Sequence, residues 1–504
     1  KQKTAYEIRL SLVGSEMCIR DRFNNWIFLG VIVLSIFIPL YPKFPLAEVA
    51  GTYVAIRLED FLILALVFFW GIINLKRAKR ILSMTITKSF LLFWFIGLVS
   101  VISAVVLTHT VQPNLGFLHL LRRVEYMLPF LVAATTIQNA RQAKIFLYGM
   151  LVTSILATLY GFGQIYLEFP VISTTNREFS KGQILTLTPG ARPNSTFAGH
   201  YDLAAYLSVV LVFASTMFFF YKSLWKKAVI TGAALIGFVL LGFTAARVSF
   251  IAAIGGIGLS FLLLKKRMLI LLLIVATLAT VAAIPQLRYR LVATITVNFL
   301  GGGGPKYEPP ASGSVNQFTP MVSMEEQIKD PNRSAQIATL SAELRDATPS
   351  TKSAWDKPFP ADIAPGEPTN ITELGVYRSF NIRYDVEWPR AIRAFQKNPF
   401  LGTGYSSITI ATDNDYLRAL GETGILGFLS FSLVFFILVK RFVKSLYKLE
   451  GFEKSFIIST LCMIGVILAT ATFIDILEAS KIAIIFWMIL GIAWAISGNY
   501  EDSK

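Results

Sequence analysis

The stretch ATDNDYLRALGETGILGF, residues 411–428, places charged side chains directly before a long apolar run. Asp413 and Asp415 each fit one of two roles there. Acidic residues in the first turn of a helix complement its dipole, and this capping role is our interpretation for one of the two. A carboxylate at such a boundary also suits a general base or a partner for arginines. The stretch therefore predicts one capping and one functional carboxylate.

Two arginines stand at comparable boundaries. Arg192 lies in TPGARPNSTFAGHYDLAAYL, where the structural alternative is that Asn194, Ser195 and Thr196 cap helical turns. Arg247 lies in LGFTAARVSF, a hairpin so tight that the side chain must sit at the membrane boundary. It can be a snorkelling anchor, but we favour a ligand-binding role because no other charge occurs between Lys227 and Lys265.

The segment FLHLLRRVEYMLPF carries Arg122, Arg123 and Glu125 inside an apolar run. An ionisable residue in such a position is a functional hypothesis by default. The alternative is that one arginine snorkels to the headgroups and that Glu125 neutralises a neighbour. The pattern thus marks these residues as candidates without choosing between the two roles.

Metal and nucleotide signals are weak. His109, His119 and His200 have no pairwise metal-ligand spacing, and Cys18 and Cys462 form no CxxC pair. GTGYSS at 402–407 lies outside any βαβ context, so it predicts a turn. We expect no metal site and no cofactor.

These side chains belong to an unusually apolar chain. Its 504 residues are 54% hydrophobic and only 15% charged, against about 25% charged in soluble domains. Runs long enough to cross the hydrocarbon core recur along it, and they predict an all-α polytopic membrane protein with about twelve transmembrane helices. The runs lie near 26–41, 60–75, 89–107, 117–138, 145–167, 202–221, 227–244, 247–264, 267–285, 416–439, 454–474 and 480–498.

The net charge of +16 does not indicate a nucleic-acid partner. Its basic residues cluster in short gaps between apolar runs, at 76–80, 222–227, 265–267 and 440–448. That is the positive-inside pattern, which predicts a cytoplasmic location for these gaps and an outer location for the alternate ones. The partner expected from composition is therefore the lipid bilayer.

The domain organisation follows from the same runs. Residues 1–22 are interpreted as non-native sequence or a cytoplasmic tail and take no part in the functional argument. Residues 23–285 hold helices one to nine, and 416–504 hold the last three and a short cytoplasmic tail. Between them, 286–415 form a large external loop, partly helical at 323–346 and 379–398, with a glycine-rich linker at 301–314. We expect this loop to act as a lid that excludes water.

Four segments together resemble the O-antigen ligase-like family of bacterial membrane enzymes. They are RPNSTFAGHYDLAAYL, FTAARVSF, RYDVEWPRAIRAFQKNPFLGTGYSS and DNDYLRALGETGILGFLSF, and they occur in this order around the long loop. The resemblance covers residue 23 to the C-terminus. It implies about twelve helices, one large external loop and a place in the bacterial plasma membrane, with the active face outward.

The resemblance also implies a function. Such enzymes transfer a glycan from undecaprenyl pyrophosphate to an acceptor hydroxyl of a glycan or lipid, without a metal. Arg192 and Arg247 would stabilise the pyrophosphate leaving group, and Asp413 would act on the acceptor. Arg123, Arg383, Asn414 and Tyr416 would contact substrate.

One position departs from the family pattern. Family ligases often carry His before the Asn of an HN.YL pattern, whereas this chain has Asp413 before Asn414. The departure favours an O-antigen or exopolysaccharide polymerase over a ligase. Two rival functions remain: a polyprenyl-phosphate-sugar transferase that uses Glu59 and Asp60 in the first external gap, and a lipid-linked oligosaccharide flippase.

Overall fold

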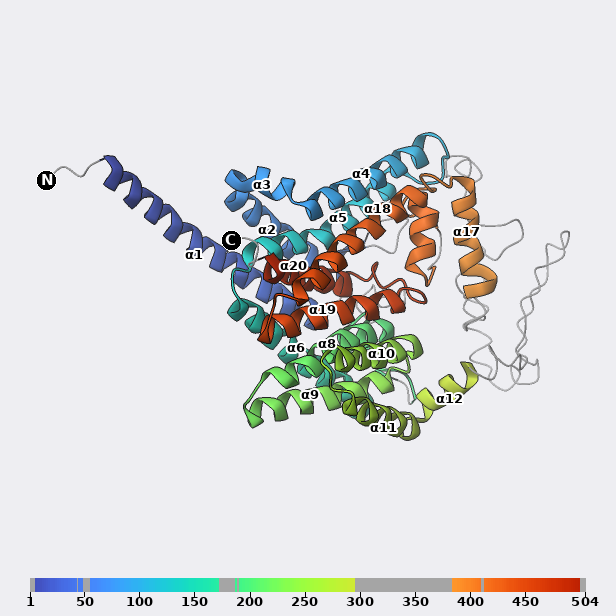
Figure 1. Ribbon diagram of the computed structural model, residues 1–504. Helices are drawn as coiled ribbons and strands as arrows, with labels where there is room; N and C mark the ends of the chain where they lie inside the picture. The colour runs from blue at the N-terminus through green and yellow to red at the C-terminus, as the bar shows by residue number, and fades with distance from the viewer. Residues whose placement is uncertain are drawn as a thin grey trace.

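A computed structural model describes residues 5–42, 44–48, 55–171, 186–187, 190–294, 383–408 and 412–498. Long helices make up most of it (Figure 1). They are α1 Ala5–Leu40, α2 Leu58–Asn74, α4 Thr85–Val106, α5 Pro113–Thr136, α6 Ala140–Tyr166, α8 His200–Phe220, α9 Leu224–Phe243, α10 Arg247–Leu263, α11 Met268–Ala283, α18 Asp415–Leu446, α19 Gly451–Thr470 and α20 Ser480–Gly498.

Shorter elements lie between them. They are η1 Leu75–Arg77, α3 Ala78–Ser83, α12 Pro285–Ala293, the π-helical turn η3 Arg383–Glu387 and α17 Trp388–Lys397. Strands β1 Pro45–Glu48 and β2 Ala55–Arg57 pair antiparallel, which is the one departure from an all-helical fold within the described ranges.

Each predicted apolar run overlaps one of the long helices, although several runs extend one to four residues beyond the helix end. Within the described part of the chain, nine helices are long and apolar enough to cross a membrane, or ten if α11 and α12, bent by 100°, form one span. Helix α10 is apolar but has 17 residues, and α5 carries the charges of Arg122, Arg123 and Glu125. The chain is thus an all-α polytopic membrane protein, and the count of twelve spans stays a prediction.

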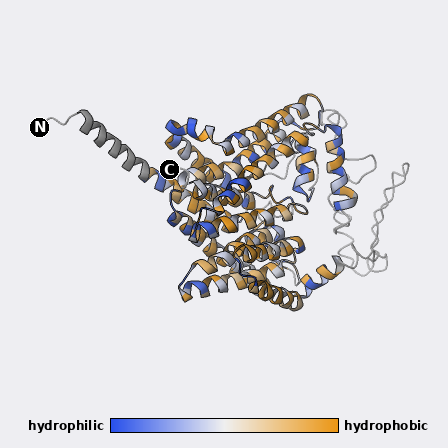
Figure 2. Cartoon of the chain, viewed as in Figure 1, coloured by the Kyte–Doolittle hydropathy of each residue, from blue (hydrophilic) through white to orange (hydrophobic). Residues whose placement is uncertain are grey.

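The bundle has two chemically different ends. Figure 1 shows α12 and α17 together at one end, which we call the α17 end, and α3 at the other. The connections at the opposite end carry the basic gaps, and the middle of the bundle is hydrophobic (Figure 2). The positive-inside rule predicts that this basic end is cytoplasmic.

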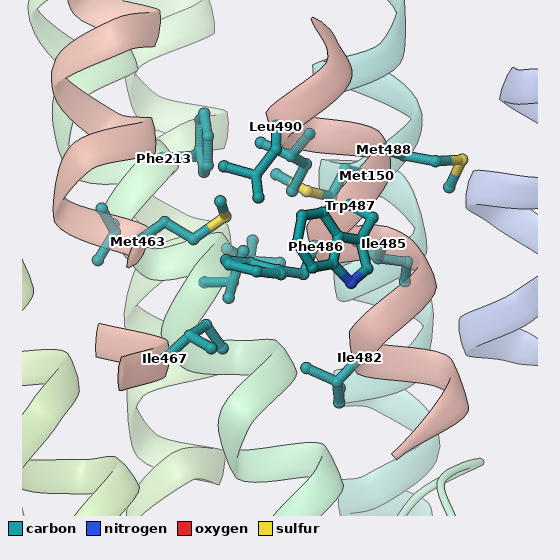
Figure 3. Close-up of a cluster of buried hydrophobic side chains, with 14 of the residues drawn as sticks. Met150, Phe213, Met463, Ile467, Ile482, Ile485, Phe486, Trp487, Met488 and Leu490 are labelled. Atoms are coloured by element: carbon teal, nitrogen blue, oxygen red, sulfur yellow. The ribbon is translucent and has the colours of Figure 1, made fainter. Parts of the chain in front are cut away.

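Helix α20 forms the centre of the bundle. It is apolar on every side, and 94% of its most apolar window is buried, as expected for a helix that other helices surround. It packs along α5 and contacts α18 and α19. Figure 3 shows Phe486 and Trp487 of α20 near Met150 of α6, Phe213 of α8 and Met463 of α19. This packing holds in place α5 and α18, the helices that carry charged residues at the α17 end.

Helix α18 is broken at Gly424, whose φ of 63° and ψ of −170° are non-helical. The turn predicted at 402–407 fills the break. Thr403 N donates to Gly421 O at 2.9 Å, and Gly404 N donates to Glu422 O at 2.8 Å. These bonds satisfy backbone groups that a break in a membrane helix would otherwise leave without partners. The break lets the first turns of α18 lie beside α17 at the end of the bundle (Figure 1).

The predicted external loop is described only in part. Its predicted helical segment at 379–398 contains η3 and α17, which make residues 383–397 helical. Its beginning is also helical, because α12 extends to Ala293. The linker at 301–314, the helix predicted at 323–346 and most of the proposed lid lie outside the described residues.

Candidate functional site

The loop before α8 carries Arg192 to the α17 end. The N-cap residue of α8 is Gly199, so the structural alternative, in which Asn194, Ser195 and Thr196 cap helical turns, does not apply to this helix. Ser195 Oγ instead donates to Ala157 O of α6 at 2.6 Å, and Thr196 Oγ1 donates to Pro39 O of α1 at 2.6 Å. These two hydroxyl groups attach the loop to α6 and α1, and they do not cap α8.

Arg192 contacts the first turn of α8. Its Nη1 donates to His200 Nε2 at 2.5 Å, and its guanidinium lies 5.8 Å from the centre of the Tyr201 ring. A guanidinium over an aromatic face gains electrostatic attraction from the ring. The side chain is therefore held at the end of the bundle.

Arg247 begins α10 directly after the tight hairpin, as predicted. Its Nη1 donates to Arg290 O at 3.3 Å and to Thr294 Oγ1, which ties α10 to α12. The charges of Arg290, Arg383 and Arg192 all act on its guanidinium. Arginines from three other segments thus gather around Arg247.

Arg383 of η3 pairs with Asp413, with 2.5 Å between Nη2 and Oδ2. Burial lowers the pKa of Arg383, but Asp413, Tyr201 and Glu387 more than offset this and the net shift is upward. Burial raises the pKa of Asp413, the Arg383 charge opposes that shift, and the Asp475 charge adds to it, so the net shift is again upward. The Asp413 side chain is 27% exposed, so the paired carboxylate remains open to solvent.

Glu387 lies one turn after Arg383. Burial, followed by the charge of Asp413, raises its pKa from 4.5 to about 8 despite the opposing charge of Arg383. Glu387 is therefore largely neutral near pH 7 and cancels little of the positive charge around it.

Asn414 and Tyr416 already have partners within the fold. Asn414 caps α18, because its Oδ1 accepts from Tyr416 N and Leu417 N, each at 3.0 Å. The N-cap residue is thus neither aspartate, but Asp415 lies in the first turn of α18, where an acidic side chain complements the helix dipole as predicted. Tyr416 OH donates to Leu468 O of α19 at 2.6 Å. Both side chains position the start of α18, and their predicted contact with substrate stays a prediction.

Together these residues form what we call the arginine site: Arg192, Arg247, Arg290 and Arg383, with Asp413. Fixed guanidinium groups with few carboxylates suit an anion, and phosphate oxygens in particular. Arg290 and Tyr201 were not predicted from the sequence. A signal existed for Arg290, because it is a basic residue next to an apolar run on the predicted outer side, where the positive-inside pattern expects few.

Arg123 belongs to a second group, which we call the ion-pair cluster: Arg123, Arg418, Glu422, Asp475 and Glu478. Arg123 contacts Glu478 and lies 3.8 Å from Glu422. Arg418 lies 2.7 Å from Asp475 and 3.4 Å from Glu422. The cluster joins α5, α18 and the α19–α20 connection, and both arginines have carboxylate partners. Asp475 and Glu478 were missed, although both stand in a short polar gap between apolar runs.

A small cavity lies beside this cluster. Its wall combines charged and aromatic side chains, namely Arg123, Glu422, Glu478, Phe93, Phe431 and Trp487. The Tyr405 ring also lines it, with the Arg123 guanidinium 5.5 Å from the ring centre. Arg123, Glu422 and Glu478 of the ion-pair cluster therefore form part of its polar side, together with Asp415.

Glu59 and Asp60, the acidic pair of the rival transferase, form hydrogen bonds with residues outside the arginine site. Asp60 Oδ2 accepts from Arg122 Nη2 at 3.1 Å, and Glu59 Oε1 accepts from Ser480 Oγ at 3.0 Å. Arg122 Nη2 also donates to Ala55 O at 2.6 Å. These contacts connect β2, α2, α5 and α20, so Glu59, Asp60 and Arg122 all have structural partners. No group of three or more potential metal-binding His, Cys, Asp or Glu residues occurs in the described part of the chain.

Comparisons with models of known protein families and with curated protein sequences find no match.

Proposed function

We propose that the protein is a membrane glycosyltransferase that moves a glycan from undecaprenyl pyrophosphate to an acceptor hydroxyl at the α17 end. One observation carries this proposal: the arginine site gathers four guanidinium groups beside one solvent-open carboxylate, Asp413. A pyrophosphate leaving group accumulates negative charge as it departs, and fixed guanidinium groups stabilise that charge without a metal.

The proposed reaction is a single displacement. The acceptor oxygen forms a bond to the anomeric carbon of the donor glycan, and the bond from that carbon to the pyrophosphate oxygen breaks. Its electron pair leaves with the polyprenyl pyrophosphate, which Arg192 and Arg247 hold. The acceptor proton passes to Asp413, whose raised pKa makes it a stronger base than an ordinary aspartate. Arg383 orients Asp413, and the base later releases its proton to water.

Within this class, we favour a polymerase of O-antigen or exopolysaccharide units. The support is Asp413 itself, which stands where family ligases often have His. In a polymerase the acceptor is a second lipid-linked glycan, so the same face of the bilayer supplies both substrates.

Reconstitution tests the proposal. Purified protein in liposomes receives lipid-linked oligosaccharide, and product size is measured with and without a lipid A–core acceptor. A ladder without added acceptor indicates a polymerase, whereas a single transfer that depends on the acceptor indicates a ligase. Transport of labelled lipid without any new glycosidic bond would contradict the proposal and favour the flippase.

The acidic-pair rival is tested in the same assay. Glu59→Gln and Asp60→Asn are compared with Arg192→Ala, with melting temperature as the folding control. The proposal predicts that Arg192→Ala abolishes transfer in folded protein. Loss of transfer in folded Glu59→Gln and Asp60→Asn, with Arg192→Ala active, would establish the rival.

A further inference from the structure

Asp475 lies in the connection between α19 and α20, and its carboxylate binds the segment that carries Asp413. Oδ2 accepts from Thr412 N at 2.9 Å, and Oδ1 accepts from Asn414 N at 2.9 Å. Oδ2 also accepts from Arg418 Nη1 at 2.7 Å. One carboxylate therefore bonds the backbone on both sides of Asp413.

The Asp413 backbone needs such support. Its φ is +48°, a left-handed conformation that L-residues other than glycine adopt at a cost. Strained backbone persists only where surrounding contacts hold it. The contacts with Asp475 are those of an ionised acceptor with backbone donors, which are among the stronger hydrogen bonds.

A second carboxylate fixes the connection itself. Asp415 Oδ2 accepts from Ile476 N at 2.9 Å and from Leu477 N at 3.0 Å, and Asp415 N donates to Ala471 O at 2.9 Å. Bonds thus run in both directions between the start of α18 and residues 471–477. Asp475 lies within this mutual arrangement and is held in place by it.

We infer that Asp475 is the positioning residue for Asp413, through its bonds to the flanking backbone. This inference rests on the proposed function, in which Asp413 accepts the proton of the acceptor. Asp475 also joins two groups of charges, because it bonds Arg418 of the ion-pair cluster and the segment of the arginine site. The ion-pair cluster and the segment of the candidate base are therefore connected through a single carboxylate.

Hydrogen–deuterium exchange of the full-length protein tests the positioning without any substrate. In Asp475→Asn, an NH2 group replaces one of the two oxygens that accept hydrogen bonds from Thr412 N and Asn414 N, so one of these bonds is lost. Exchange in the peptide covering residues 412–417 should therefore be about tenfold faster or more. Glu478→Gln is the matched control: it neutralises a carboxylate in the same connection that has no bond to residues 412–414. Wild-type exchange in folded Asp475→Asn would overturn the inference.

If Asp475→Asn does not fold, Asp475→Glu carries the same test, because it keeps the charge and moves the carboxylate by one methylene. Its exchange should be intermediate, and unchanged exchange would likewise overturn the inference.

The pH profile of transfer tests the connection to the base. The groups that act on Asp413 are Arg383 and Glu387 of η3, Asp475 and Arg418. Removal of the Asp475 charge lowers the pKa of Asp413, so the acid limb of kcat/KM should move to lower pH while kcat falls. An unmoved limb would contradict the inference. Absence of transfer by wild-type protein would overturn the proposed function alone, since the exchange result does not depend on activity.

Discussion

The arginine site and the ion-pair cluster lie near the same end of the bundle but differ in how their charges are balanced. In the ion-pair cluster, Arg123 and Arg418 share three carboxylates. In the arginine site, Arg192, Arg290 and Arg383 all act on Arg247, and Arg383 pairs with Asp413. Buried charges are normally paired. The cluster therefore stabilises the fold, whereas we propose that the arginine site binds an anionic ligand.

The difference shows that an arginine's position relative to the membrane does not decide its role. Arg123 and Arg247 both lie at or near the predicted outer boundary. Arg123 has carboxylate partners, whereas Arg247 bonds a backbone carbonyl and a hydroxyl and has three arginines acting on it. The two arginines therefore differ in the charge of their partners. Substitutions in each region test whether this difference separates stability from activity.

The largest effect is expected for Asp413→Asn. The amide cannot accept the proton of the acceptor, so transfer by reconstituted protein should fall by about 10²–10⁴-fold, the usual contribution of a general base. Melting temperature in detergent is measured as the folding control, because the substitution also removes the charge that pairs with Arg383. Wild-type rates in this variant would remove Asp413 from the reaction.

Arg247→Ala should reduce transfer by about 10²–10³-fold, as when one stabilising donor is lost from an active site. Arg247→Lys should recover only part of the rate, since lysine keeps the charge but not the planar fork. Initial rates and melting temperature are measured together. An active Arg247→Ala beside a folded but inactive Arg123→Ala would reverse the comparison between the two regions.

Arg418→Ala should act on stability instead. The side chain is 16% exposed and pairs with Glu422 and Asp475, and loss of one partner from a buried ion pair costs about 3–5 kcal/mol. The melting temperature and the yield of monodisperse protein should both fall. A variant with unchanged melting temperature would show that the cluster contributes little to the fold.

Glu387→Gln should have the smallest effect, visible as a change in pH dependence. The pKa of Glu387 is raised from 4.5 to about 8 by burial and then by Asp413, so its stability contribution is complete below pH 4.5 and is lost as pH rises to about 8. Melting temperatures of wild type and Glu387→Gln across this window measure the contribution. The variant should lose less stability with rising pH, and identical slopes would contradict the account.

Sequence patterns predicted the features that depend on local composition. The apolar runs mark the long helices, and the tight hairpin places Arg247 at the start of α10 because a short polar gap between two spans leaves no other position. Arg192, Arg383 and Asp413 were each identified from short motifs. The structure brings Arg192 and Arg383 within electrostatic range of Arg247, and Asp413 pairs with Arg383.

Features that depend on distant contacts could not be predicted. Asp475 bonds Thr412 and Asn414 across separations of 63 and 61 residues, and no periodicity in the sequence relates these positions. The break at Gly424 depends on backbone bonds from residues 399–404, so hydropathy alone reads α18 as one helix. For the same reason, the sequence could not show that Arg123 is paired.

Binding of polyprenyl pyrophosphate directly measures whether Arg192 and Arg247 hold the pyrophosphate group. Affinity is measured for wild type, for the double variant Arg192→Ala/Arg247→Ala, and for Glu59→Gln/Asp60→Asn as the matched control, with polyprenyl monophosphate as competitor. Loss of two charge-assisted contacts should weaken binding by about 100-fold or more in the arginine variant, leave the control near wild type, and favour pyrophosphate over monophosphate. Equal affinity of wild type and the arginine variant, or loss of binding only in the acidic-pair variant, would contradict the account.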